Sequence, residues 1–418
     1  MASAGPAMDP NVRWLGVGAS IRALGLSLIG PFLALYLRNV LGLGYADIGA
    51  IVLVVAIPPL LVYPLAGFLT DRLGRRRIIV LALSAEAASM LGTAYFLSAG
   101  SLVGIAGAFA VVSTMASIAG PAISAYVADF AHGSDRTRGY TWIRVGWNAG
   151  FTVGVLLGGA LLGLVGFVAV TLSAGAFLAA GTTFVALVLE PSPYDRRRAR
   201  PTPLGRPIDG VPGSISQSVR LLARDRPFLI VCLSGALATL TINQWSTTFP
   251  LFVNTVLGIP YALLGVGFAI NGILVVFGQT EMTKRSIGHA HTSLAIVGTL
   301  LYVAAFLLLG AFGAFGFAVL AAFFASVIVL TTGENLTSIF ATTLPSNLAP
   351  ASELGAYNGA FFAITGVGSI VAPLFGGLVL AATTDPLLTW AILVVPAIPA
   401  VLLLRTIAPR LPAAANRA

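Results

Sequence analysis

Residues 67–77 read Gly67-Phe-Leu-Thr-Asp71-Arg72-Leu-Gly74-Arg75-Arg76-Arg77. This stretch begins inside an apolar segment, 46–70, and precedes a second one, 78–98. Each segment is long enough to cross the roughly 30 Å hydrocarbon core of a bilayer as a helix. Gly74 predicts a tight turn between the two helices, and Gly67 predicts close contact with a neighbouring helix. The stretch therefore predicts a basic turn at one face of a membrane.

The whole chain has the composition of a membrane protein. Of its 418 residues, 57% are hydrophobic and 9% are charged, and the mean hydropathy is +0.96; soluble proteins carry about 25% charged residues. The chain contains twelve apolar stretches long enough to cross a membrane: 14–37, 46–70, 78–98, 102–128, 140–164, 167–189, 228–256, 262–282, 292–313, 315–343, 356–381 and 387–405. The alternation of a membrane barrel is absent, so each stretch is predicted to be a helix. The predicted fold class is an all-α membrane protein with twelve transmembrane helices.

A hydrophilic stretch, 190–226, divides the apolar segments into six and six. The predicted domains are an N-terminal six-helix half at 1–189, a cytoplasmic linker at 190–226 and a C-terminal six-helix half at 227–418. We expect the two halves to be pseudo-symmetric bundles. The linker is interpreted as a solvated segment whose arginines hold it on the inner side of the membrane, with a regulatory or lipid-binding role as the alternative.

The distribution of basic residues predicts the orientation. Of the 23 basic residues, 20 fall in the termini and the even-numbered loops, and Arg38 is the one in an odd-numbered loop. Both termini are therefore expected in the cytoplasm of a multi-pass protein of the cell (inner) membrane. The net charge of +9 is thus a topology signal, and no nucleic-acid partner is expected.

The residues Gly67, Asp71, Arg72, Gly74, Arg75 and Arg76 resemble the G-x-x-x-D-R-x-G-R-R signature of the major facilitator superfamily. The resemblance implies a secondary transporter in which two six-helix halves rock about a central site. It also implies that these residues form a gating motif, with Asp71 facing the positive N-terminal end of helix 11. A small-molecule substrate, the lipid bilayer, protons as a coupling ion, no cofactor and a monomer are the corresponding expectations.

Helix 5 carries glycines at four-residue spacing, Gly146, Gly150, Gly154 and Gly158, similar to the antiporter signature of exporter branches. Val155 stands where that signature has proline. A related pattern recurs in helix 11, as two repeated halves predict. Small residues at this spacing allow close helix packing, and a role in closing the cavity is the alternative.

Four charged residues lie inside the predicted spans and more than three residues from either end: Arg22, Glu86, Arg144 and Glu334. Each costs about 2.5–3.5 kcal/mol to place at the centre of a membrane helix, which makes it a functional candidate. By resemblance, helices 1 and 10 line the cavity, so Arg22 and Glu334 would lie on opposite walls and could couple transport to protons. Glu86 is a further coupling candidate, with pairing inside the N-terminal half as its other interpretation. Arg144 lies close in sequence to Asp129 and Asp135 and is expected to join them in a structural salt-bridge cluster with the Asp71 motif, with substrate contact as the alternative.

Uncharged polar residues near the midplane are candidates for binding a solute. Asn243, Gln244 and Trp245 are consecutive in helix 7, so not all three can face inward. Further candidates are Tyr36, Asn335 and Asn358. The asparagines have interhelical hydrogen bonding as their alternative.

The favoured function is export of a small amphipathic or hydrophobic solute by alternating access, in exchange for protons. Proton-coupled uptake of a small solute is the alternative, with Glu334 as the coupling carboxylate. Two departures from the family pattern weaken the expectation of proton coupling. Helix 4 lacks an arginine at 102–120, and the second-half equivalent of the signature, Gly278 to Arg285, is degenerate. A polytopic enzyme is not expected, because Cys232 and three histidines provide no metal or nucleophile constellation. No metal site is predicted.

The predicted topology can be tested by labelling. In a Cys232→Ala background, Arg38→Cys and Arg200→Cys are expected to react with a membrane-impermeant maleimide from opposite sides of the membrane, because an odd number of helices separates them. Reaction from the same side would contradict the twelve-helix arrangement.

Overall fold

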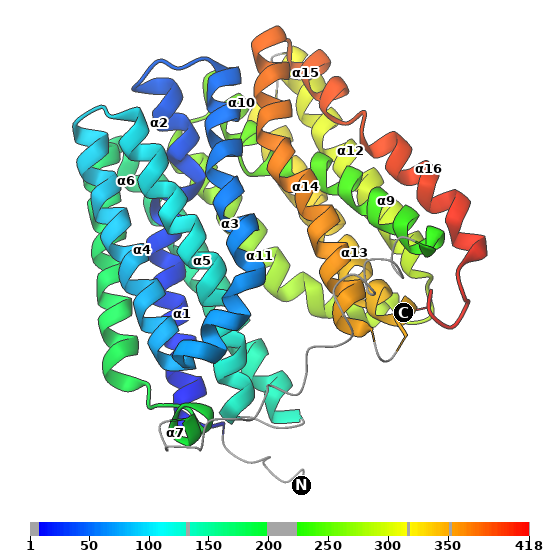
Figure 1. Cartoon of the computed structure of the whole chain (residues 1–418). Coiled ribbons are helices and arrows are strands. Elements are labelled where there is room, and N and C mark those ends of the chain that lie inside the picture. Colours follow the sequence, from blue (N-terminus) through cyan, green and yellow to red (C-terminus); the bar gives the residue numbers. More distant parts are fainter. Residues whose placement is uncertain (1–7, 131–133, 199–223, 316–317, 351–352, 418) are drawn as a thin grey trace, which may run out of the picture. The chain divides into compact units, whose positions relative to one another are not determined.

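The computed structural model describes residues 8–130, 134–198, 224–315, 318–350 and 353–417. Almost all of them are helical (Figure 1), and the β-structure in these residues is one isolated bridge between Ala290 and Arg417. The chain forms two compact units, each with its own internal packing. Unit 1 comprises Met1–Leu41, Ile51–Leu204 and Pro260–Gly272, and unit 2 comprises Gly42–Ala50, Gly205–Ile259 and Ile273–Ala418.

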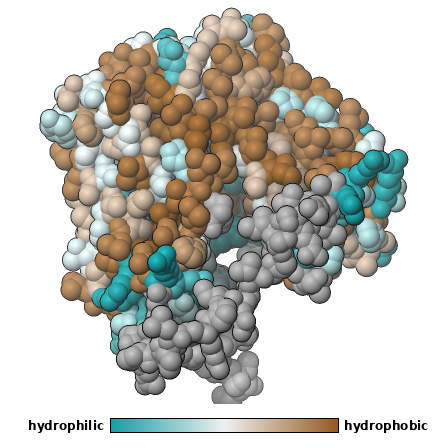
Figure 2. All heavy atoms as spheres, in the orientation of Figure 1, coloured by the Kyte–Doolittle hydropathy of each residue, from teal (hydrophilic) through white to brown (hydrophobic). Residues whose placement is uncertain are grey.

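The first group of helices lies before the hydrophilic stretch. Its members are α1 (Pro10–Ile29), η1 (Gly30–Phe32), α2 (Leu33–Asn39), α3 (Tyr45–Leu73), α4 (Arg75–Ser98), α5 (Leu102–Phe130), α6 (Ser134–Val188) and α7 (Pro193–Arg198). Within unit 1, α1 packs along α6, and α4 packs against α5 and α6. In the view of Figure 2, apolar side chains cover most of the helix faces of unit 1, and polar side chains gather toward the end at which α7 lies.

The second group follows residue 223. Its members are α9 (Arg226–Ile242), η2 (Asn243–Trp245), α10 (Thr248–Thr255), α11 (Tyr261–Ser286), α12 (His291–Phe315), α13 (Val319–Leu348), α14 (Leu354–Ala382), α15 (Pro386–Leu393), α16 (Ala397–Ile407) and η3 (Ala408–Arg410). Within unit 2, α9 packs against α14 and α16, and α12 packs against α13 and α15.

The described residues contain eleven helical segments that are long and apolar enough to cross a membrane. One of them, Arg138–Val188, has 51 residues, about 76 Å at 1.5 Å per residue and more than twice the hydrocarbon thickness. Gly166 divides it, because its φ of 76° and ψ of 172° are not helical. The segment therefore supplies two spans, which confirms the predicted all-α membrane fold with twelve crossings.

The first span of each half of the chain is interrupted in the second half of the span. In the segment Pro10–Asn39 the helix breaks at η1, which contains Pro31, and in the segment Arg226–Thr255 it breaks at η2. Pro250 follows η2 and has no N–H to donate to the carbonyl of Ser246, so one hydrogen bond of a regular helix is missing at this point. Irregular backbone at membrane depth occurs where it is buried in protein or lines a cavity.

Glycines bring α1 and α6 into backbone contact. A Cβ atom at Gly146, Gly150, Gly154 or Gly158 would overlap the carbonyl oxygen of Gly16, Ser20, Leu24 or Leu28, respectively. Both partners repeat every four residues, so one face of α6 lies along one face of α1. The glycines expected in helix 5 thus act in packing within unit 1.

The two glycines of residues 67–77 differ in their roles. Gly74 has φ of 96°, a conformation that a residue with a Cβ rarely adopts, and it makes the turn between α3 and α4 as predicted. At Gly67 the prediction of close helix contact is wrong for this structure. A Cβ there would meet no other described atom within 4 Å.

The two units depart from the predicted domain boundaries in two ways. Residues 42–50, which include the start of α3, belong to unit 2, and residues 260–272, which include the start of α11, belong to unit 1. Glycines again explain this grouping: a Cβ at Gly49 would overlap the carbonyl oxygen of Pro373, and one at Gly265 would lie 2.8 Å from that of Val155. The predicted linker is not wholly a connection either, because α7 packs on α4 and α5; its middle part, 199–223, lies outside the described residues.

The close packing of α1 on α6 predicts a matched pair of variants. Gly150→Ala is expected to destabilise the protein by about 1–3 kcal/mol, because its Cβ overlaps the Ser20 carbonyl. Gly163→Ala lies on the same helix in open space and is the control. A lowered apparent melting temperature for Gly150→Ala alone is expected; equal melting temperatures would contradict the packing account.

Candidate functional site

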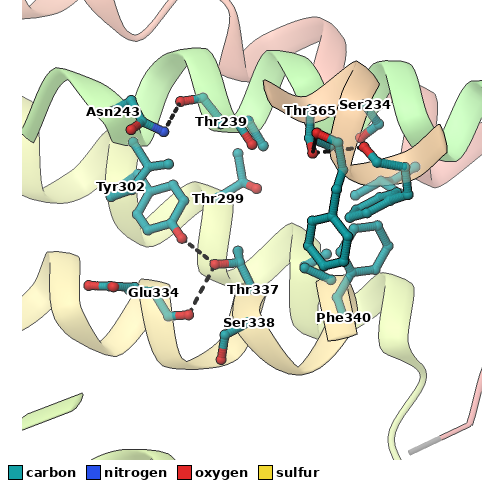
Figure 3. Close-up of a pocket in the computed structure, with 18 of the residues that line it drawn as sticks. Ser234, Thr239, Asn243, Thr299, Tyr302, Glu334, Thr337, Ser338, Phe340 and Thr365 are labelled. Atoms are coloured by element: carbon teal, nitrogen blue, oxygen red, sulfur yellow. Dashed lines mark hydrogen bonds between the residues drawn. The ribbon is translucent and has the colours of Figure 1, made fainter. Parts of the chain in front are cut away.

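A pocket of about 340 Å³ lies inside unit 2. Residues of α9, η2, α12, α13 and α14 line it, together with Leu404 of α16. Among the described lining residues one side chain, that of Glu334, is charged. Figure 3 shows Glu334, Asn243 and Tyr302 toward one end of the pocket, and Phe340, Ser234 and Thr365 toward the other. The pocket is therefore amphipathic and polarised along its length.

The break in the helix at η2 provides one wall of the pocket. Asn243 and Trp245 line it, whereas Gln244 does not and is fully buried. The Gln244 amide nitrogen donates to the carbonyls of Leu240 (3.0 Å) and Ala372 (3.2 Å), and its oxygen accepts from Thr248. The three consecutive residues therefore do not all face the pocket. The hydrogen bonds of Gln244 connect α9, α10 and α14.

The opposite wall comes from α13. Glu334, Thr337, Ser338 and Ala341 line the pocket and follow helical spacing i, i+3, i+4 and i+7. They form one stripe about 10 Å long at 1.5 Å per residue. The Tyr302 hydroxyl of α12 hydrogen-bonds Thr337, which fixes the phenol ring beside this stripe (Figure 3).

Most hydroxyls in the lining donate to the protein itself. Ser234 donates to Ala400, Ser246 to Asn243, Ser338 to Asn335 and Thr365 to Phe361, each to a backbone carbonyl at 2.8–2.9 Å. A hydroxyl has one hydrogen and two lone pairs, so a hydroxyl in this state presents an acceptor to the pocket. The Asn243 amide donates one of its two N–H groups to the Thr239 carbonyl at 3.1 Å. The lining therefore presents acceptors from these hydroxyls and both donor and acceptor groups from Asn243.

Three further solute-binding candidates do not line this pocket. Tyr36 is buried in unit 1, where its hydroxyl donates to the Leu97 carbonyl at 2.8 Å. Asn335 donates to the Leu274 carbonyl of α11 at 3.1 Å, and Asn358 donates to the Ser346 hydroxyl of α13 at 3.0 Å. The asparagines follow their alternative interpretation, interhelical hydrogen bonding, because carbonyl and hydroxyl partners lie on the neighbouring helix.

Arg22 and Glu86 form a bidentate ion pair inside unit 1. The Arg22 Nε and Nη2 atoms each lie 2.6 Å from a Glu86 carboxylate oxygen, and the Glu86 side chain is fully buried. The guanidinium also lies 5.2 Å from the centre of the Trp147 ring. The interpretation that paired Glu86 within its own half fits this geometry. The expectation that Arg22 faces Glu334 does not, because the fork of Arg22 is occupied by Glu86.

The residues around Gly74 form a polar cluster that includes the start of the predicted linker. Arg75 pairs with Asp71 and stacks on the Tyr194 ring, with its guanidinium 4.0 Å from the ring centre. The Asp195 carboxylate accepts from the backbone N–H groups of Arg75 (2.7 Å) and Arg76 (3.2 Å), so it caps α4. The linker therefore contributes directly to the geometry of the predicted gating motif.

Two other arginines of the motif can be placed. Arg76 donates to the carbonyls of Leu189 and Ala186, both at 2.7 Å, and so covers the C-terminal end of α6. The Arg72 guanidinium lies 5.8 Å from the centre of the Phe68 ring.

The predicted salt-bridge cluster includes Asp129, while no ion pair of Arg144 is found among the described residues. Asp129 lies 3.4 Å from Arg75 Nε and accepts from the Ser192 hydroxyl at 2.7 Å. Arg144 is exposed, about three turns into α6. Asp129 stands at the end of α5 beside the start of α4, which brings it to the motif and away from Arg144.

Sequence reasoning missed most of the hydroxyl and aromatic lining, including Ser234, Thr299, Tyr302, Thr337, Phe361 and Thr365. The spacing of Thr337 and Ser338 from Glu334 is the one signal that could have identified two of these residues. Among the described residues no group of three or more His, Cys, Asp or Glu could hold a metal ion.

The helices, the paired units and the internal pocket define a multi-pass membrane protein of the transporter type. The family model of the Major Facilitator Superfamily matches residues 15–373, and the chain belongs to this family. An uncharacterized MFS-type transporter, YttB of Bacillus subtilis, is 25% identical over 88% of both chains. The tetracycline resistance protein, class C, of Escherichia coli is 24% identical over 89% of both chains.

Other comparisons agree with this family. The quinolone resistance protein NorA of Staphylococcus aureus is 28% identical over 138 residues, 32% of this chain and 34% of NorA. Among solved structures, a mutant of the nucleoside transporter NupG superposes with a TM-score of 0.75 at 13% identity, covering 96% of this chain and 100% of the NupG chain. This likeness concerns the fold alone.

The Arg22–Glu86 pair predicts a large loss of stability on removing one partner. Glu86→Gln leaves the guanidinium buried without its carboxylate and is expected to cost about 3–5 kcal/mol. Replacing both residues, Arg22→Met with Glu86→Leu, is expected to recover most of that loss. Glu281→Gln is the control, because it removes an exposed pair with Arg285 worth about 0–1 kcal/mol. Apparent melting temperatures of the purified proteins measure all three; equal losses for Glu86→Gln and Glu281→Gln would contradict a structural role.

Proposed function

We propose that the protein exports a small amphipathic or hydrophobic solute across the cell membrane by alternating access, in exchange for protons. The membrane would be the inner membrane of a bacterium, with both termini in the cytoplasm, and the working unit a monomer. The observation that carries the proposal is the pocket of unit 2, which is lined by Asn243 and Trp245 of the helix interruption η2. A broken helix at the substrate site is a recurrent feature of secondary transporters.

The lining suits a solute that is partly apolar. Aromatic rings, including those of Trp245, Phe361 and Phe362, lie in the same pocket as Glu334 and the hydroxyl groups. Two relatives are named for resistance to tetracycline and to quinolones, which supports export of compounds of similar character. Uptake of a solute with protons is the competing direction, since the same carboxylate could couple either process.

The proposed coupling residue is Glu334. It is the charged residue of the described pocket lining and is partly exposed, whereas Glu86 is fully buried in a bidentate pair with Arg22 and does not line this pocket. A carboxylate in contact with the solute can bind either a proton or the solute. Because binding of one excludes binding of the other, proton movement is coupled to solute movement.

The proposed gate is the cluster around Gly74. Asp71 shares Arg75 with Asp129 in unit 1. We propose that a conformational change transfers Asp71 from Arg75 to the N-terminus of α14, the predicted helix 11, where the helix dipole favours a carboxylate by about 0.3–1 kcal/mol.

Transport by the purified protein tests this proposal. Proteoliposomes with an acidic interior are expected to accumulate tetracycline or a fluoroquinolone above the external concentration. Glu334→Gln is expected to abolish this uphill accumulation and to retain downhill exchange, because the proton-binding group is lost while the pocket stays. Glu281→Gln, an exposed carboxylate of α11, is the control and should behave as wild type.

Each alternative has its own outcome. Accumulation only with an alkaline interior would favour proton-coupled uptake. Uphill accumulation by Glu334→Gln would exclude Glu334 as the coupling residue. Flux that never exceeds the external concentration in any gradient would contradict secondary active transport of these compounds.

A further inference from the structure

A second pocket, of about 170 Å³, lies in unit 1 between the first turns of α1 and the beginning of the long helix α6. Its described lining consists of Pro10, Arg13, Trp14 and Val17 of α1 and Trp142 of α6. The four residues of α1 follow the spacing i, i+3, i+4 and i+7, so they form one face of that helix. This pocket shares none of its described lining residues with the pocket of unit 2.

Packing holds both tryptophan rings of this pocket in place. The Trp142 ring lies directly on Gly16 of α1, where a Cβ atom would overlap the indole nitrogen. That nitrogen donates to the Arg13 carbonyl at 3.0 Å. The Trp14 ring packs edge-to-face on Phe184, with 5.9 Å between the ring centres. Trp14 and Trp142 nevertheless remain 46% and 40% exposed, so the two rings form fixed walls that a ligand can reach.

The pocket lies where two membrane segments begin, since the apolar helical segments start at Pro10 and at Arg138. Asn11 Oδ1 accepts from the Glu190 N–H at 2.9 Å and from the Tyr126 hydroxyl at 3.2 Å, which places the start of α1 beside the residues just before α7. Polar side chains gather toward that end of unit 1 in Figure 2. Tryptophan is enriched at the level of the lipid headgroups. The pocket therefore lies at the depth at which headgroups and acyl chains meet.

Arg13 gives this pocket a positive charge. It is the one charged residue of the described lining, it is exposed, and no carboxylate among the described residues forms an ion pair with it. The neighbouring carboxylate, Asp9, accepts from the backbone N–H of Asn11 at 2.8 Å. A guanidinium matches phosphate oxygens in charge and in geometry. The described lining holds no carboxylate that could receive the ammonium group of a zwitterionic lipid.

We propose that this pocket binds an anionic phospholipid, with the phosphodiester at Arg13 and the glycerol and upper acyl chains against Trp14, Val17 and Trp142. Val145, one turn beyond Trp142 and also exposed, continues the apolar surface along α6. A lipid in this position contacts α1 and α6 together, so its binding is expected to stabilise the folded protein by mass action. The proposal concerns unit 1 and does not depend on the proposed function.

Two lipids with identical acyl chains and different headgroup charge provide the test. Native mass spectrometry measures the binding of phosphatidylglycerol and of phosphatidylcholine to the purified full-length protein during a titration in detergent. The wild-type protein is expected to bind phosphatidylglycerol at least about fivefold more tightly, and Arg13→Gln is expected to reduce this preference about fivefold, the factor for one arginine near anionic headgroups. Arg144→Gln is the matched control and should keep the preference, because Arg144 is an exposed arginine of α6 outside the described lining.

A second variant and a labelling experiment locate the lipid. Trp14 is 46% exposed, so Trp14→Ala is expected to fold normally. It should weaken the binding of both lipids several-fold and leave their ratio unchanged, because it removes apolar contact and no charge. A photoactivatable phosphatidylglycerol with a diazirine near the headgroup is expected to label the wild-type peptides that contain Trp14 and Trp142, and to label them less in Arg13→Gln.

Inorganic phosphate distinguishes a lipid site from a simple anion site. An excess of phosphate at constant ionic strength is expected to leave phosphatidylglycerol bound, because phosphate has no acyl chains to contact the indoles. Displacement of the lipid by phosphate would identify an anion site and overturn the proposal. Equal binding of the two lipids to wild-type protein, an equal loss of preference in Arg13→Gln and Arg144→Gln, or the absence of label from both tryptophan-containing peptides would overturn it as well.

Discussion

The constraint on which this structure depends is that no backbone N–H or C=O group can go without a hydrogen bond inside a bilayer. It forces the apolar segments into helices, and close packing between them then requires glycine where two backbones meet, as at Gly150 against Ser20. It also makes each interruption of a helix informative. At the break η2, Asn243 and Trp245 line a pocket. The side chain of Gln244 holds this interrupted backbone in place by donating hydrogen bonds to the carbonyls of Leu240 and Ala372. The polar groups available for function are therefore few, and each can be traced to a specific place in the helix packing.

The two carboxylates predicted to lie within membrane spans illustrate how the surroundings separate structural from functional groups. Glu86 meets Arg22 in a fork-to-fork pair that is sealed inside unit 1, and such a pair is costly to break. Glu334 lines a pocket together with hydroxyls, an amide and aromatic rings. The same residue type at similar expected depth thus has a packing role in one unit and lines a cavity in the other.

The fold followed from the sequence because hydropathy is a strong and local signal, and the twelve apolar stretches became twelve crossings. The capping of α4 by Asp195 was not predictable, because it joins residues 120 positions apart along the chain. In the site, Glu334, Asn243 and Trp245 were identified from depth and polarity. Gln244, Asn335 and Asn358 were candidates on the same grounds, but each donates to a group on a neighbouring helix that the sequence cannot reveal. The hydroxyl groups that line the pocket were not predicted, because serine and threonine are common in membrane helices and their presence alone does not indicate a site.

The central claim is that the transported solute occupies the pocket formed by α9, η2, α12, α13 and α14. The most direct measurement is photoaffinity labelling with an aryl-azide derivative of tetracycline or of a fluoroquinolone, followed by mass spectrometry of the labelled peptides. The account predicts covalent label on pocket-lining positions of α9, α13 or α14, in the wild-type protein and in Glu334→Gln alike. Label confined to helices of unit 1 would contradict it.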